Sequence, residues 1–414
     1  MKTWFTYIAA AVFALATAFL FADYQIASST FSLISTYLVS LGTLITIPVI
    51  VFSFPSAIAS LRKDRLGGYA ASSIITWTLV TSIILPMVPA VFFYLYPSAF
   101  PVTSSAGSSG DLVGYYTEYA MMSNINALSV VNPFNTIATA SSIVLPLIIL
   151  SWIFGIFLNP SSDTIRPAYA VMNSFSEIMH KIARFYTVYG YIIAYFSLTD
   201  LFLSAYVEKT VIAVPSFLFM LLIITGIIVF ALLPILFALF TKFKKNPYKV
   251  LFLSISSLVM SLSTGNVLSS VATNMTTSRY SLGVQKRNAV TSTIFFSLFS
   301  KGGSAAISTF LILTLITAMG GILDSTTIIL VALAASAASF VAFTSFGMES
   351  VITTYIALKI LNVDLYGAES ALLSILMITN GLSSLLDSAV IAMGTKAVSV
   401  ATKTDMDVPY KDYI

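Results

Sequence analysis

Long apolar runs follow one another along almost the whole chain, and they constrain its fold more than any other feature. Charged residues make up 9% of the 414 residues, against roughly a quarter in a soluble domain, and the mean hydropathy is +0.95. So few charges cannot cover a soluble globule of this size. No run has the spacing of barrel strands, so we predict an all-α polytopic membrane protein. The runs span about 4–22, 31–61, 68–97, 131–159, 168–199, 210–241, 250–275, 288–319, 326–360 and 369–402.

The chain has no cysteine and a single histidine, His180. This composition excludes disulfides and thiolate metal sites and argues against a histidine-rich metal centre. The sequence has no nucleotide-binding loop of the P-loop type, so it does not support an activity driven by ATP hydrolysis. His180 stands beside Lys181 near the expected cytoplasmic start of a helix, where an interfacial role is favoured over catalysis. We therefore expect no enzyme activity, no cofactor and no metal centre.

Basic residues orient the runs, because lysine and arginine stay on the cytoplasmic side of membrane helices. If Lys2 is cytoplasmic and the first six runs each cross once, the basic segments 62–65, 166–184 and 242–249 all lie inside. The intervening segments 22–30, 98–130 and 200–209 hold five acidic residues and one basic residue, Lys209, and we place them outside. We expect a multi-pass protein of the plasma membrane with both termini in the cytoplasm.

The seventh and ninth runs break simple alternation. The seventh begins after Lys249 and ends before Lys286, both cytoplasmic, so it enters and leaves on one side. The ninth fits the same pattern from the outside. We predict two re-entrant hairpins with polar centres at 261–266 and 344–349; ordinary kinked pairs of short helices are the alternative. Two oppositely oriented hairpins, each followed by a spanning helix, form an inverted repeat, which is typical of transporters with a midplane site.

Several short segments follow one another in a distinctive order along the chain. They are Arg65-Leu66-Gly67, Asn132-Pro133-Phe134 with Leu145-Pro146, Ser176 to Ile182, Asn246-Pro247-Tyr248-Lys249 and Leu282 to Arg287. In this order they resemble one family, the glutamate transporter homologues or dicarboxylate/amino acid:cation symporters, and the resemblance covers nearly the whole chain.

The resemblance implies a homotrimer with eight transmembrane helices plus the two hairpins. A scaffold of helices one, two, four and five would hold a transport domain that slides like an elevator. The chain would then divide into scaffold helices one and two (1–66), transport-domain helix three (67–98), an outer loop (99–130), scaffold helices four and five (131–209), and a last transport-domain segment (210–414). That segment holds helix six, the hairpins at about 247–278 and 326–360, helices seven and eight, and a cytoplasmic tail.

Four charges fall within the last apolar runs, where a charge costs about 2.5–3.5 kcal/mol on insertion scales and is therefore a functional candidate. They are Lys301, Glu349, Asp387 and Lys396. The resemblance assigns Asp387 to the α-ammonium group of a substrate, by charge-assisted hydrogen bonds. A capped or water-bridged structural aspartate is the alternative.

The family's substrate-binding arginine is replaced by Val390. Lys396 does not suit its place, since the nine residues that separate it from Asp387, at about 100° each, put it on the opposite face of the helix and about 13 Å farther along. We expect Lys396 to reach toward the cytoplasm instead. Loss of bidentate recognition lowers the expectation for glutamate, aspartate or dicarboxylates and favours a neutral amino acid.

The sodium-binding motif of the family's seventh helix is also changed. Its asparagine and aspartate correspond to Ser300 and Gly302, with Lys301 between them and Gly303 and Ser304 after them. A second sodium-binding aspartate corresponds to Val398 or Gly394. Thr81 and Ser82 match family positions near a sodium site but are neutral. Because a hard cation prefers carboxylate oxygens, sodium coupling is doubtful.

Lys301 suggests a substitute for sodium, because its ammonium can act as a tethered cation or release a proton. Glu349 stands in the second hairpin tip where the family has a small residue. We hypothesise that it pairs with Lys301 when this gate closes, or carries a proton. The alternative is an exposed Glu349 with no role.

The first tip, Ser263-Thr264-Gly265-Asn266, offers hydroxyl and N–H groups to an α-carboxylate, although these residues serve equally as helix caps. The substrate-binding candidates are therefore Asp387, Val390, Gly394, Ser263, Thr264, Gly265, Asn266 and Gly347.

We expect a secondary amino acid transporter that is sodium-independent, either proton-coupled or exchanging, with a neutral or small substrate. A sodium- or proton-coupled glutamate, aspartate or dicarboxylate symporter is the first alternative, and an anion channel on the same scaffold is the second. The expected partners are the amino acid, protons, the lipid bilayer and two further copies of the chain, with no nucleic acid.

Overall fold

The chain forms helices throughout the residues that the computed structural model describes, which are 2–22, 24–97, 144–207, 215–318, 321, 323–342, 347–363, 375–409 and 413. Apart from one isolated bridge between Val284 and Asp405, no strand pairing occurs among them. Seven helices in this part of the chain are long and apolar enough to cross a membrane. The all-helical prediction is confirmed. The outer loop at 99–130 and the start of the fourth run at 131 lie outside the described residues.

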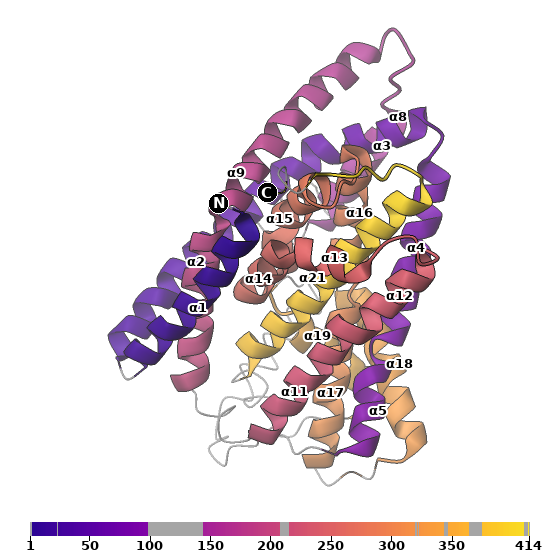
Figure 1. Cartoon of the computed structure of the whole chain (residues 1–414). Helices are drawn as coiled ribbons and strands as arrows, with labels where there is room; N and C mark the ends of the chain where they lie inside the picture. The colour runs from indigo at the N-terminus through magenta and orange to yellow at the C-terminus, as the bar shows by residue number, and fades with distance from the viewer. Residues whose placement is uncertain are drawn as a thin grey trace.

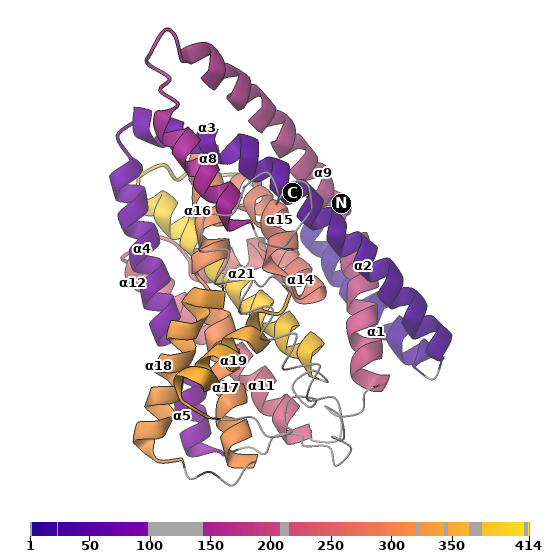
Figure 2. The same ribbon diagram turned by 180° about the vertical axis from the view of Figure 1, so that it is seen from behind.

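One group of helices lies along the side of the molecule that holds α9 (Figures 1 and 2). α9 spans Arg166–Val207 without interruption and packs along α1 (Thr3–Phe21) and α2 (Gln25–Pro48). α2 continues through a π-helical turn, η1 (Val49–Ser53), into α3 (Phe54–Lys63), which packs on α8 (Leu145–Phe157). The π turn directly follows Pro48, whose missing N–H removes a hydrogen bond from the helical ladder.

The remaining helices form a second group around α21 (Leu376–Ala401). Pro86 separates α4 (Gly67–Ile84) from α5 (Met87–Leu95). The sixth run forms α11 (Pro215–Ile227), a second π turn, η2 (Ile228–Leu232), and α12 (Leu233–Phe240). The eighth run is broken in two, as α16 (Lys286–Phe299) and α17 (Gly302–Ala318).

The seventh and ninth runs each fold into a helical hairpin. After a short helix, α13 (Pro247–Leu253), the first hairpin consists of α14 (Ile255–Thr264) and α15 (Val267–Tyr280). Its turn is Gly265, with φ +56°, and Asn266, whose side chain caps α15. The second consists of α18 (Ser325–Val341) and α19 (Glu349–Ile360), with Gly347 at φ +86° before α19. Tip residues 343–346 lie outside the described part.

Two apolar cores hold these helices together. The first, which we call the α9 core, joins α1, η1, α3, α8 and α9 through Tyr7, Ile50, Phe54, Leu147 and Ala194. The second, the α21 core, joins α4, α11, α12 and α17 to α21 through Trp77, Phe217, Phe237, Phe310 and Leu386. One face of the first hairpin and of α16 belongs to the α9 core, through Met260, Leu268, Val271, Met275 and Ile294.

The sequence suggested that His180 lies near the start of a helix, and this prediction is wrong. His180 is the fifteenth residue of α9 and is completely buried. The apolar run at 168–199 marks most of this helix, which extends beyond the run at both ends. The two chain ends lie close together, since the Lys2 ammonium donates a hydrogen bond to the Tyr413 carbonyl at 3.2 Å.

Candidate functional site

The break between α16 and α17 is the centre of the candidate site. The backbone leaves α16 at Ser300, with ψ +72°, and α17 begins at Gly302. A Cβ on Gly302 would lie 2.9 Å from the Thr81 carbonyl oxygen, and one on Gly303 would lie 2.4 Å from Leu386 Cβ. Glycine is required at both positions because α4 and α21 approach the backbone this closely.

Asp387 of α21 caps the start of α17 from a neighbouring helix. Its Oδ1 accepts hydrogen bonds from the Gly303 N–H at 2.7 Å and the Ser304 N–H at 3.4 Å. Its Oδ2 accepts one from the Ser304 hydroxyl at 2.7 Å, and the residue is completely buried. A carboxylate at a helix N-terminus satisfies unpaired N–H groups and is favoured by the helix dipole. Asp387 thus fixes the broken helix, which matches the structural alternative for this residue.

Lys301 and Glu349 form a buried ion pair beside this cap. The Lys301 ammonium lies 3.4 Å from Glu349 Oε1, and each side chain is only 1% exposed. The other carboxylate oxygen, Oε2, accepts a hydrogen bond from the Gly347 N–H at 2.7 Å. The alternative of a solvent-exposed Glu349 is therefore wrong. The pair connects the break in the eighth run to the tip of the second hairpin.

The charges of this cluster do not balance. Lys301 and Glu349 both act electrostatically on Asp387, so two carboxylates share one ammonium. The α17 N-terminus adds a partial positive charge of about half an elementary charge. Buried charges need compensation by opposite charges and hydrogen bonds, which the carboxylates of this cluster receive from Lys301, Gly303, Ser304 and Gly347.

Most polar groups at the first hairpin tip are used within the hairpin. The hydroxyls of Ser263 and Thr264 both donate to the Met260 carbonyl, at 2.8 and 2.9 Å. The Asn266 side chain accepts from the Leu268 N–H at 2.8 Å. These contacts follow the helix-cap alternative for the tip. Its neighbour is the second tip, since a Cβ on Gly347 would lie 3.7 Å from Asn266 Nδ2.

Asn380 is a site residue that sequence reasoning missed. It lies on α21 two turns before Asp387 and is 3% exposed. Its side-chain amide donates to the Gly347 carbonyl at 2.5 Å and accepts from the Ser350 N–H at 3.3 Å. An uncharged amide within an apolar helix was the only available signal.

Trp77 and Phe296 lie against the segment of α21 that holds Val390 and Gly394, and the sequence did not predict this contact. The Trp77 indole N–H donates to the Val390 carbonyl at 3.1 Å. A Cβ on Gly394 would lie 2.5 Å from Trp77 and 2.8 Å from Phe296. The backbone at the position of the family's arginine therefore lies beside an aromatic ring.

Of the remaining candidate residues, Thr81, Ser82 and Ser300 lie at the break between α16 and α17, and Lys396 contacts the C-terminal segment. Thr81 and Ser300 share a hydroxyl contact at 3.3 Å beside the break. Ser82 is buried there, and its hydroxyl has no hydrogen-bond partner within the described residues. Lys396 lies elsewhere. It is 7% exposed, donates to the Leu282 carbonyl at 2.5 Å and pairs with Asp405, so it reaches the C-terminal segment without reaching solvent.

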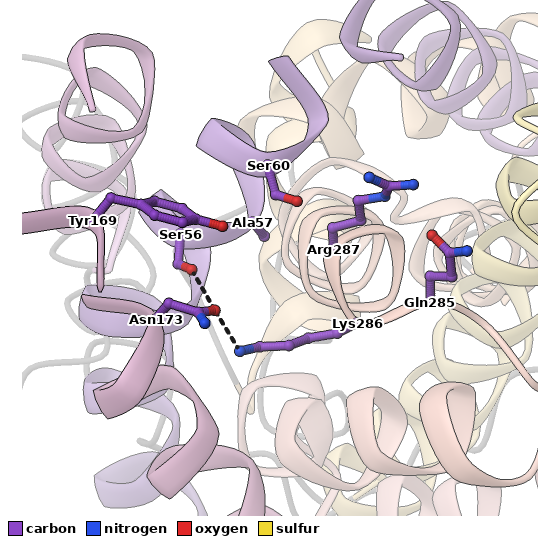
Figure 3. A pocket seen from close by; sticks show the side chains of 8 residues that line it. All are labelled: Ser56, Ala57, Ser60, Tyr169, Asn173, Gln285, Lys286 and Arg287. Atoms are coloured by element: carbon purple, nitrogen blue, oxygen red, sulfur yellow. Dashed lines mark hydrogen bonds between the residues drawn. The ribbon is translucent and has the colours of Figure 1, made fainter. Parts of the chain in front are cut away.

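A polar pocket of about 230 Å³ lies at the opposite boundary of α16, where it meets α3 and α9. Figure 3 shows Ser56 and Lys286 both bonded to the Asn173 amide oxygen, at 3.2 and 3.1 Å. Next to it, Glu177 of α9 pairs with Lys286 at 3.0 Å and Arg279 at 3.4 Å. These ion pairs join the two groups of helices.

Comparison with known proteins identifies one family. The model of the sodium:dicarboxylate symporter family matches residues 3–403. No individual curated protein matches the chain.

Proposed function

The chain belongs to the sodium:dicarboxylate symporter family, whose members are secondary active transporters of dicarboxylates or amino acids, and we propose that this one carries a small neutral amino acid without sodium. The observation that carries the proposal is the buried cluster of Lys301, Glu349 and Asp387. Its lysine supplies a positive charge where a sodium-coupled relative would bind an ion.

The donor groups around the break support sodium independence. Asp387 already accepts three hydrogen bonds from the start of α17, and Glu349 is shared by Lys301 and Gly347. The other oxygens there are hydroxyls, such as those of Thr81 and Ser300. Neutral oxygens and occupied carboxylates make a poor site for a hard cation.

The same cluster supports recognition of an ammonium group or a proton. Its two carboxylates exceed its single ammonium by one charge. The α-ammonium of an amino acid or a transported proton restores neutrality. Trp77, Phe296 and Val390 present no cation to a second carboxylate, which favours a neutral side chain over glutamate or aspartate.

The two cores support an elevator. The α9 core contains helices that we assign to the scaffold, together with one face of the first hairpin and of α16, and the α21 core contains helices that we assign to the transport domain. The first hairpin packs on α2 and α9 on one side and on α21 on the other, while the second packs on α17 and α21. We infer that both hairpins are re-entrant, that the α21 group moves against the α9 group, and that three copies assemble in the plasma membrane with cytoplasmic termini.

Uptake into proteoliposomes tests the substrate and the coupling ion. We expect saturable counterflow of a labelled neutral amino acid, unchanged when choline replaces sodium and not inhibited by glutamate or aspartate. A strict sodium requirement would restore the symporter alternative. Anion current without counterflow would instead support a channel.

The role of the cluster is tested by Lys301→Met and Glu349→Gln, each assayed across a range of pH. We expect each substitution to alter the pH dependence of uptake. The coupling proposal fails if both variants keep the profile of the unsubstituted protein.

A further inference from the structure

The second hairpin tip is held by a residue outside the charged cluster. We propose that Asn380 is a gate-positioning residue, which latches this tip closed through hydrogen bonds to Gly347 and Ser350. The proposal rests on the transport function, because a latch matters only where the hairpin opens. It assigns to Asn380 a role separate from substrate or ion binding.

The contacts of Asn380 use both ends of its amide. Its Nδ2 donates to the Gly347 carbonyl at 2.5 Å. Its Oδ1 accepts from the Ser350 N–H at 3.3 Å and from the Ser350 hydroxyl at 2.5 Å. The amide therefore spans the turn that leads into α19. A side chain with only donors or only acceptors cannot make this set of bonds.

Gly347 is the point at which the latch meets the ion pair. Its N–H donates to Glu349 and its carbonyl accepts from Asn380, so both backbone polar groups are occupied. Its φ of +86° is strained for any residue with a side chain. The turn from Gly347 to Ser350 is thus held at two points, to α17 through Glu349 and Lys301 and to α21 through Asn380.

Asn380 also lies against the first hairpin. A Cβ on Gly265 would be 3.6 Å from Asn380 Cβ, and one on Gly381 would be 3.0 Å from the Leu262 carbonyl. This segment of α21 therefore contacts both tips. Because Asn380 is 3% exposed, opening the second tip would leave buried polar atoms without partners until water enters. The latch consequently favours closure wherever water is excluded.

A single cysteine reports tip opening, since the native chain has none. Thr353 of α19 is completely buried behind the tip, so a Thr353→Cys reporter reacts with a soluble maleimide only when the hairpin opens. In this background Asn380→Ala is expected to speed labelling about tenfold, and Ser350→Ala by a smaller factor. Both measurements are made without substrate.

The matched control is Ser383→Ala, on the same helix. Ser383 is also buried, but its hydroxyl donates only to the Asn380 carbonyl, a bond within α21. It should leave the labelling rate unchanged. Equal rates in the Asn380→Ala and Ser383→Ala proteins overturn the latch. If Asn380→Ala does not yield folded protein, an unchanged rate in Ser350→Ala overturns it.

This experiment separates the latch from the proposed function. Labelling without substrate measures opening whatever the cargo is. If neutral amino acids are not transported but Asn380→Ala still speeds labelling, the substrate class fails and the latch stands. If transport is found and the labelling rates do not differ, only the latch fails.

Discussion

At the scale of single residues, Lys301 is a buried cation whose charge must be compensated inside the protein. It is 1% exposed and holds a carboxylate on α19 while acting on a second one on α21. Removing one member of a buried pair leaves an uncompensated charge, whereas removing both need not. The energy of the site therefore depends on the whole cluster.

Lys301→Met is expected to lower the free energy of unfolding by about 3–5 kcal/mol, because Glu349 and Asp387 then face each other without a cation. The double variant Lys301→Met/Glu349→Gln should recover much of this loss. Thermal unfolding of the detergent-solubilised protein measures both effects. A double variant less stable than Lys301→Met alone would contradict this account.

The sequence predicted the residues whose charge is out of place and missed those whose role depends on packing. Lys301, Glu349 and Asp387 stood out because a charge in an apolar run is rare. Trp77 and Asn380 did not, because an indole or an amide in such a run is equally expected as core or cap. The capping role of Asp387 depends on the approach of α17 to α21, which no local pattern encodes.

At the scale of helices, the two hairpins follow from the positions of basic residues. The spans expected for them are about 247–278 and 326–360, and these stretches hold α13 to α15 and the helices α18 (Ser325–Val341) and α19 (Glu349–Ile360). The π turns η1 and η2 were not predicted, because hydropathy does not distinguish one helical hydrogen-bond pattern from another.

A variant of Asn266 distinguishes a helix-capping role from a substrate-binding role for this residue of the first tip. Asn266→Ala removes the cap from the Leu268 N–H, which is expected to cost about 1 kcal/mol. Hydrogen exchange should rise in the first turn of α15 and leave α13 unchanged, since α13 has its own cap, Asn246. A large rise in the KM for substrate without faster exchange would instead show that Asn266 binds the cargo.

At the scale of the whole molecule, two apolar cores meet along the first hairpin and α16 and are joined by ion pairs at one end. Glu177 of α9 holds both Arg279 and Lys286, and Asp64 after α3 pairs with Arg287. In the proposed elevator these contacts must break as the α21 group moves.

Glu177→Gln is therefore expected to weaken this arrangement, by about 1 kcal/mol because Glu177 is 45% exposed. Hydrogen exchange should increase in the segment from Arg279 to Arg287, and the salt dependence of thermal unfolding should fall. Asp407→Asn is the control, since Asp407 is exposed and its partner Lys245 lies within the same group of helices. Equal exchange in the two variants would argue against a junction role.

The excess negative charge of the cluster has an electrical consequence. In the proposed cycle Lys301, Glu349 and Asp387 cross the membrane field with the moving helices, and with all three side chains ionised the empty cluster carries a net charge of −1. An inside-negative potential acts on such a charge with about 2.3 kcal/mol per 100 mV for full passage, and pushes it outward. Loaded with a proton or an ammonium, the cluster is neutral and crosses without electrical work. The membrane voltage would then power the return of the empty carrier, and accumulation of the cargo would follow the potential without any sodium gradient.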